Sequence, residues 1–180
     1  TYPRALSPIS MSDLSPSERR ERIEKLADLI EDIRICMLTT VDTDGKPWSR
    51  PMATQSVRFG GDLWFFTRDD SEKVEHIARN RDVGAAFAHP GRQDYVTMAG
   101  TALIVDARQK AEELWSEPLA AWFPKGLDDP HLRLIKLEVE RAEYWDSPSN
   151  PVVYALGYVK SKLTGEPATD LGEIEKLSIG

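Results

Sequence analysis

The sequence predicts a single α+β domain, in which an antiparallel β-barrel or sheet is flanked by helices. Two patterns lead to this prediction: an amphipathic helical segment near the N-terminus, followed by several segments of two-residue alternation joined by short turns. The chain has 180 residues, of which 41% are hydrophobic and 29% charged, as in ordinary globular domains. No internal repeat or long linker is present, so residues 15–180 are expected to form the domain. Residues 1–14 are expected to be a disordered tail or a non-native remnant, with Met11 as a candidate native start.

The first predicted element is a helix that begins at a capping box. Ser15 is a suitable N-cap, Pro16 suits the first helical position, and Glu18 can reach back to the backbone of Ser15. Apolar residues then recur with a period of about 3.6 residues. They are Ile23, Leu26, Ala27, Ile30 and Ile33. Charged residues lie between them, so this helix is expected to cover an apolar surface.

Alternating apolar and polar residues predict the strands. Strands are expected at residues 35–41, 48–59, 63–67, 83–89, 95–105 and 132–145. Apolar residues at helical spacing predict short helices at 70–80 and 107–115. Turn-forming pairs such as Asp44-Gly45 and Gly60-Gly61 separate the strands. Pro51 interrupts the second strand, and a proline at such a position marks either a bulge or an edge strand.

Two further elements are expected towards the C-terminus. Asn150 and Pro151 can start a helix that Gly165 ends, although the β-prone residues 152–154 favour a strand. The spacing of the apolar residues leads us to prefer the helix. An edge strand is expected in the tail, around Ile174, Leu177 and Ile179.

Charge and composition exclude several classes of protein. The 30 acidic residues outnumber the 23 basic ones, which gives a net charge of −7 and a pI of about 5.1, so no nucleic acid partner is expected. No apolar run approaches the roughly 18–20 residues of a membrane-spanning helix, and the N-terminus lacks a secretory signal pattern. Cys36 is the only cysteine, so no intramolecular disulfide is possible, and a cytoplasmic location is expected. Its place in an apolar strand predicts a buried structural thiol.

The segment from Thr67 to Lys73 is the first candidate for chemistry. A predicted strand ends there and a helix begins. Free backbone N–H groups, the hydroxyls of Thr67 and Ser71, and the Lys73 ammonium can together cradle a phosphate. The alternative is plain N-capping by Asp69 or Asp70, whose charges would also repel an anion. Local sequence alone favours the capping alternative.

Arg50 and the tryptophans are the other candidates. If Pro51 marks a bulge, neighbouring backbone polar groups are free for a ligand and Arg50 lies beside them; at an edge, Arg50 is solvated. Large aromatic residues mostly pack cores or interfaces, but Trp122 and Trp145 adjoin predicted loops and can reach a ligand or a second subunit. The three histidines lack metal-ligand spacing, so no metal site is predicted.

Six groups of residues follow one another between residues 18 and 165. They are Leu38-Thr39-Thr40, Ser49-Arg50-Pro51-Met52, Leu63-Trp64-Phe65-Phe66-Thr67 with Ser71 and Lys73, Gly100 with Ala102, Trp122-Phe123-Pro124, and Ala142-Glu143-Tyr144-Trp145-Asp146. In this order they resemble the pyridoxamine 5′-phosphate oxidase-like flavoproteins of the general stress protein branch. No single group is specific; the resemblance lies in their succession.

This resemblance implies an antiparallel split β-barrel that forms a homodimer, with FMN bound at the subunit interface. In the parent oxidases an arginine on the second strand, an aromatic–threonine pair, and a following serine and lysine bind the flavin. The matching positions here are Arg50, Phe66, Thr67, Ser71 and Lys73. The resemblance therefore favours the phosphate cradle over plain capping.

Further cofactor contacts are implied around the flavin ring. Pro51 is expected to contact the cofactor, and Met52, just after it, is expected to line the isoalloxazine ring. Tyr95 matches a glutamine that reaches the flavin from the partner subunit, and Trp145 is a further candidate contact. Gln55 is also expected to contact the cofactor, because it occupies the position of a lysine in the oxidases.

The chain also departs from the oxidases. It has Gln55 in place of that lysine, Glu72 in place of a second basic residue, and after Gly165 one lysine and no arginine or histidine. The oxidases hold the substrate phosphate with a basic C-terminal segment, and phosphate recognition depends on such cations. Flavin binding without appreciable pyridoxamine phosphate oxidase activity is therefore expected.

Three functions are left open by the sequence. The first is a flavin-dependent oxidoreductase acting on an unknown small substrate, with a nicotinamide as the electron donor. The second is an FMN-binding stress protein that senses or buffers the cofactor without fast turnover, and the third is a dimeric interaction protein that has lost its ligand. No catalytic acid or base is assigned. Relatives of this fold also use deazaflavin or haem, and no histidine here is placed as a haem ligand.

Overall fold

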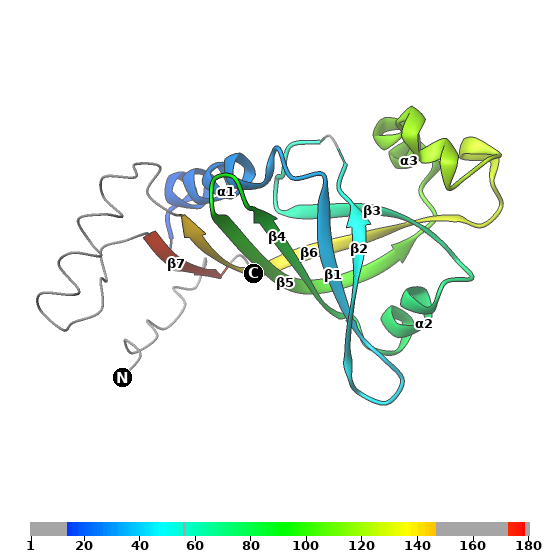
Figure 1. The fold of residues 1–180 in the computed structure, drawn as a ribbon, viewed down its shortest axis with the longest axis horizontal. Helices are drawn as coiled ribbons and strands as arrows, with labels where there is room; N and C mark the ends of the chain where they lie inside the picture. Colours follow the sequence, from blue (N-terminus) through cyan, green and yellow to red (C-terminus); the bar gives the residue numbers. More distant parts are fainter. Residues whose placement is uncertain (1–13, 56, 147–172, 179–180) are drawn as a thin grey trace, which may run out of the picture.

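A strongly curved antiparallel sheet dominates the computed structural model, which describes residues 14–55, 57–146 and 173–178 (Figure 1). In these residues the helices are α1 (Pro16–Ile30), α2 (Glu72–Arg79) and α3 (Arg108–Leu114), with 3₁₀ turns at Glu117–Ala121 and Gly126–Asp128. The strands are β1 (Ile35–Val41), β2 (Pro47–Ala53), β3 (Asp62–Arg68), β4 (Asp82–His89), β5 (Asp94–Val105), β6 (Leu132–Asp146) and β7 (Glu173–Ser178).

The strand order of the sheet is β2-β1-β4-β5-β6-β3, and β7 pairs with β6 outside this path. The consecutive strands β2 and β3 therefore occupy the two ends of the order, and β3 makes its ladder with the start of β6. α1 and α2 lie towards opposite ends of the curved sheet (Figure 1). The α+β class, the antiparallel pairing and the edge strand in the tail are confirmed, whereas the helix expected at 151–165 lies outside the described residues.

The first helix forms as its capping box predicts. The Ser15 amide donates to Glu18 Oε2 at 2.8 Å, and the Glu18 amide donates to Ser15 Oγ at 3.4 Å. Leu26 is fully buried on this helix, together with Ala27 and Ile30 on the same apolar face. α1 thus places its apolar face against the interior of the curved sheet, where burial of such side chains is the main source of stability.

The second strand ends earlier than the sequence predicts. β2 stops at Ala53, not at Phe59, because its only ladder partner among the described strands, β1, begins at Ile35, opposite Ala53. Phe59 is buried nonetheless, as an apolar anchor of the following loop. The register is unbroken through the pairing of Pro51 with Met37, so the proline marks an edge strand and the alternative of a bulge is wrong.

A register shift does occur between β5 and β6. Ala99 pairs with Arg141 but Gly100 pairs with Val139, so β6 carries one extra residue at this point. A Cβ on Gly100 would overlap the carbonyl oxygen of Glu138 and lie 2.9 Å from its carbonyl carbon. Glycine is required here because the backbones of the two longest strands approach too closely for any side chain.

Two apolar clusters hold the fold together. The larger one fills the interior of the curved sheet beneath α1 and includes Phe65, Phe87 and Leu137. The smaller one lies on the other side of β3, where Phe66 meets the ring of Trp115 edge-on at 5.9 Å between centroids. Among the described residues, no helix is both long and apolar enough to cross a membrane.

Cys36 is a buried residue of the larger cluster, as predicted. It is 1% exposed, and burial raises the pKa of its thiol to about 12. Because the thiolate is the reactive form, we expect Cys36 to remain unmodified by a disulfide reagent at pH 8 in the native protein and to react at once in denaturant. Absorbance of the released thiol product measures both rates. Rapid modification of the native protein would contradict this burial.

Candidate functional site

The N-terminus of α2 gathers polar groups from two neighbouring elements. Ser71 is the N-cap of α2 in extended conformation, and its side chain makes no capping hydrogen bond. Its hydroxyl instead donates to Arg68 O at 2.8 Å and lies 3.1 Å from Thr67 Oγ1 at the end of β3. The Ser71 side chain therefore leaves the first turn of the helix uncapped, while the Ser71 carbonyl oxygen accepts from the Val74 amide at 2.9 Å.

Arg50 reaches this region from β2. Its Nη1 donates to Thr40 Oγ1 on β1 at 2.6 Å. Its Nη2 is buried and has no hydrogen-bond partner among the residues that the structure describes. Burial lowers the pKa of the guanidinium, and the nearby Glu72 carboxylate partly offsets this effect. A buried charged donor without an acceptor is costly, so this nitrogen is suited to an anion that enters the site.

Lys73 adds a second cation from the first turn of α2. Its side chain is half-buried. Burial, and after it the neighbouring charge of Arg50, lower the pKa of the ammonium. Two cations that repel one another, together with two hydroxyls and a helix N-terminus, form an electropositive cluster. We call this set, Arg50, Thr67, Ser71 and Lys73, the phosphate cradle. A phosphate dianion fits its donors and its charge.

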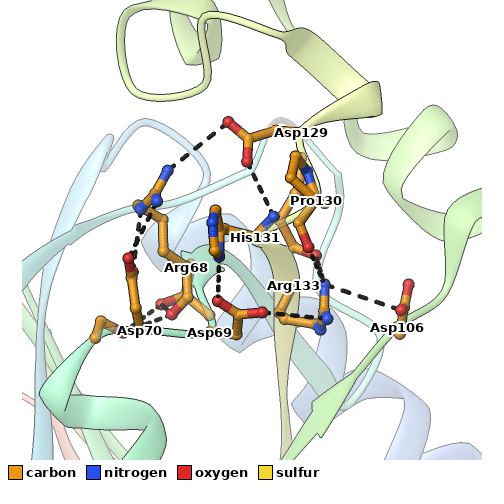
Figure 2. A network of polar contacts seen from close by, with 11 residues as sticks. Arg68, Asp69, Asp70, Asp106, Asp129, Pro130, His131 and Arg133 are labelled. Atoms are coloured by element: carbon orange, nitrogen blue, oxygen red, sulfur yellow. Dashed lines mark hydrogen bonds and ion pairs between the residues drawn. The ribbon is translucent and has the colours of Figure 1, made fainter.

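Two acidic residues beside the cradle, Asp69 and Asp70, are paired with basic groups outside it, as Figure 2 shows. Arg68 donates to both carboxylate oxygens of Asp70, at 3.1 Å each, and this hydrogen bonding lowers the pKa of Asp70. Asp69 lies 2.8 Å from His131 Nδ1 and 3.2 Å from an Arg133 guanidinium nitrogen. These pairs reduce the repulsion of an anion by Asp69 and Asp70, whereas Glu72 stays exposed and its charge acts on Arg50 and Lys73.

The same contacts fix the turn that leads into α2. The Asp69 amide donates to His131 O at 2.9 Å, and the His131 amide donates to Asp129 Oδ1 at 3.0 Å. Asp129 is almost buried and lies 3.7 Å from Arg68. The turn between β3 and α2 is thus held against the chain entering β6 (Figure 2), which leaves Ser71 and Lys73 in a defined position.

The other predicted residues on β2 and β3 divide between two faces. Met52 is buried and lies on the same face of β2 as Arg50, since side chains alternate along a strand. Pro51 is exposed on the opposite face. Phe66 packs in the smaller cluster, on the other side of β3 from Thr67. Gln55 lies outside the cradle, on the wall of a cavity of about 560 Å³ between α1 and the loop after β2.

Tyr95 and Trp145 are not brought to the cradle within one chain. They pair with each other where β5 begins and β6 ends. Thr67, by contrast, pairs with Arg133 at the start of β6, so the length of that strand separates the two groups. Tyr95 is 44% exposed on the sheet surface. A contact between either residue and the cradle requires a second chain.

Comparison with known proteins identifies the family and agrees with the fold. The family model described as pyridoxamine 5′-phosphate oxidase like matches residues 21–169. The chain belongs to the pyridoxamine 5′-phosphate oxidase-like family. General stress protein 26 of Bacillus subtilis is 32% identical over 120 residues, which cover 65% of this chain and 83% of that protein. The predicted family and its general stress protein branch are confirmed.

Solved structures of this family confirm the predicted split-barrel fold. A candidate general stress protein 26 of Jannaschia sp. CCS1 superposes with a TM-score of 0.71 at 24% identity, covering 88% of this chain and 99% of that one. The general stress FMN/FAD binding protein of Xanthomonas citri superposes with a TM-score of 0.62 at 29% identity. That match covers 73% of this chain and 92% of that one.

Two buried polar residues next to the cradle were missed by sequence reasoning. Thr40 is fully buried, and its Oγ1 lies 2.9 Å from Nδ1 of the buried His76 on α2. The sequence did contain one indication of Thr40. In the two-residue alternation of β1, Thr40 follows Cys36 and Leu38 on the buried face, and a buried polar side chain needs a hydrogen-bond partner. His76 gave no such signal, because its partner lies on another element.

Proposed function

We propose that this chain is an FMN-binding flavoprotein whose phosphate cradle holds the FMN phosphate. The observation that carries the proposal is the buried, unpartnered Nη2 of Arg50 beside the half-buried Lys73. Phosphate oxygens are acceptors that would satisfy both cations, and the hydroxyls of Thr67 and Ser71 would donate to the same group on turning away from Arg68 O. Met52, on the same face of β2 as Arg50, is the proposed contact for the ring.

Family relationships support the same ligand. The Xanthomonas citri neighbour is described as an FMN/FAD binding protein. The cradle offers donors for a single phosphate group, which favours FMN over FAD. When bound, FMN would supply the electron-transfer chemistry, and the protein would bind it, orient it and limit its contact with water.

We also propose that the functional unit is a homodimer in the cytoplasm. Met37 is exposed and pairs with exposed Pro51 on β2 and exposed Ala86 on β4, so apolar side chains from three neighbouring strands lie side by side on one exposed face. Such a face is typical of a protein interface. A second copy across a two-fold axis can bring its own Tyr95 and Trp145 towards the first cradle. Size-exclusion chromatography with light scattering tests this state.

The reaction that we favour is flavin-dependent oxidoreduction of a small electrophile with a nicotinamide donor. Pyridoxamine phosphate oxidation is not proposed, because Gln55 bears no charge and instead donates to Ala53 O at 3.3 Å. Stopped-flow mixing with a nicotinamide and then an acceptor separates an enzyme from an FMN-storing protein. A bound flavin that neither NADH nor NADPH reduces would support storage.

The decisive test of flavin binding is the visible spectrum of the freshly purified protein, with the released chromophore identified after denaturation. We expect a flavin spectrum and free FMN, or uptake of one FMN per chain by colourless protein. A protein that binds neither FMN nor a deazaflavin on titration would contradict the proposal. A stable dimer without any such ligand would then favour an interaction protein.

A further inference from the structure

We propose that Thr40 and His76 are positioning residues that hold Arg50 in the phosphate cradle through a buried hydrogen-bond relay. The relay runs from Arg50 Nη1 to Thr40 Oγ1, at 2.6 Å, and from Thr40 to His76 Nδ1, at 2.9 Å. It deepens the proposed function, on which it rests, since Arg50 matters only if an anion binds beside it. Thr40 and His76 themselves stay out of contact with the ligand.

The direction of each hydrogen bond follows from the chemistry of the groups. A guanidinium has donors only, so Thr40 Oγ1 accepts from Arg50. The hydrogen of the Thr40 hydroxyl then needs an acceptor, and His76 Nδ1 is the one that the described residues supply. Since Nδ1 accepts, the imidazole proton is on Nε2. The relay therefore specifies one tautomer of His76.

Burial makes the relay rigid. Thr40 is 0% exposed and His76 is 8% exposed, so water does not compete for either hydrogen bond. Arginine has many rotamers, and a single fixed acceptor at Nη1 selects the one in which Nη2 is buried without a partner. Holding the donor in place before the ligand arrives reduces the ordering cost of binding.

The relay also connects the two halves of the cradle. Arg50 comes from β2, whereas Ser71 and Lys73 come from the first turn of α2. His76 lies on that same helix, so the hydrogen bond to Thr40 fixes the guanidinium relative to the helix N-terminus. A phosphate can then contact both halves without rearrangement of either.

The test compares FMN with riboflavin, which lacks the phosphate. Thr40→Val keeps the shape of the side chain but loses the hydroxyl. For this variant we expect the dissociation constant of FMN to rise about 10-fold and that of riboflavin to change less than about 2-fold. Thr40→Ser restores the hydroxyl and should recover FMN affinity to within about 3-fold. His76→Leu should act like Thr40→Val. Thr101→Val is the control, because it removes a threonine hydrogen bond, to Glu140 at 2.7 Å, away from the cradle.

Two results would overturn the relay. One is unchanged FMN affinity in Thr40→Val. The other is an equal loss of FMN and riboflavin, which is the signature of general structural damage. If the wild-type protein binds no FMN, the proposed function fails, and the relay is judged by ¹⁵N NMR of His76. A protonated Nδ1 there would contradict it, and an unprotonated Nδ1 that changes in Thr40→Val would support it.

Discussion

Replacement of Arg50 by methionine is expected to weaken FMN binding about 100-fold while riboflavin affinity changes less than about 2-fold. The guanidinium contributes one buried donor that has no partner within the described residues, and a phosphate oxygen is the acceptor proposed for it. Methionine fills a similar volume without charge. Fluorescence titration with both flavins measures the two affinities.

The same variant is expected to be no less stable than the wild-type apoprotein. Burial lowers the pKa of Arg50, and the charge of Arg50 contributes to the lowered pKa of Lys73, so the cradle is electrostatically unfavourable without an anion. Arg79→Met is the matched control, because Arg79 is exposed at the other end of α2 and pairs with Glu75. Equal FMN affinities in Arg50→Met and Arg79→Met would contradict the cradle.

Gly100→Ala is expected to have the largest effect on stability, a loss of about 3 kcal/mol in the free energy of unfolding. The new Cβ would overlap the Glu138 carbonyl oxygen and lie 3.0 Å from the Glu140 amide nitrogen. Both are backbone atoms of β6, which cannot turn aside as a flexible side chain can. Relief requires separation of β5 from β6 at their register shift.

Thermal and denaturant unfolding of the apoprotein measure this loss, which corresponds to a fall in Tm of about 6–12 °C for a domain of this size. Gly60→Ala is the control, because a Cβ at this exposed position would meet no atom within 4 Å. It makes the same change to the unfolded chain without the overlap. If both variants unfold alike, the close approach of β5 and β6 is not a determinant of stability.

Local patterns were sufficient to predict most of the elements. The capping box at Ser15 set the start of α1, and alternation predicted β1 with the bounds that the structure has. The end of β2 was wrong because a strand stops where its partner stops, and that partner is set by tertiary structure. For the same reason alternation did not reveal that β3 pairs with β6.

The candidate site was predictable to the extent that its residues are neighbours in sequence. Thr67, Ser71 and Lys73 lie at one strand-to-helix junction, whose chemistry can be read directly. Arg50 was already a candidate because of its neighbour Pro51, but only the family resemblance connected it to that junction, since nothing local does so. The relay through Thr40 and His76 was missed because two buried polar groups become partners only when β1 and α2 pack together.

The strand order has a consequence for biosynthesis. A ribosome releases Arg50, Ser71 and Lys73 before β6, yet β3 acquires its ladder, and Thr67 its position, only when β6 is present. A nascent chain therefore lacks a complete cradle, and we expect cofactor capture to follow release of the finished domain. Under the proposed function, bound FMN would stabilise the completed domain and slow its degradation by cellular proteases, and would not act as a template during synthesis.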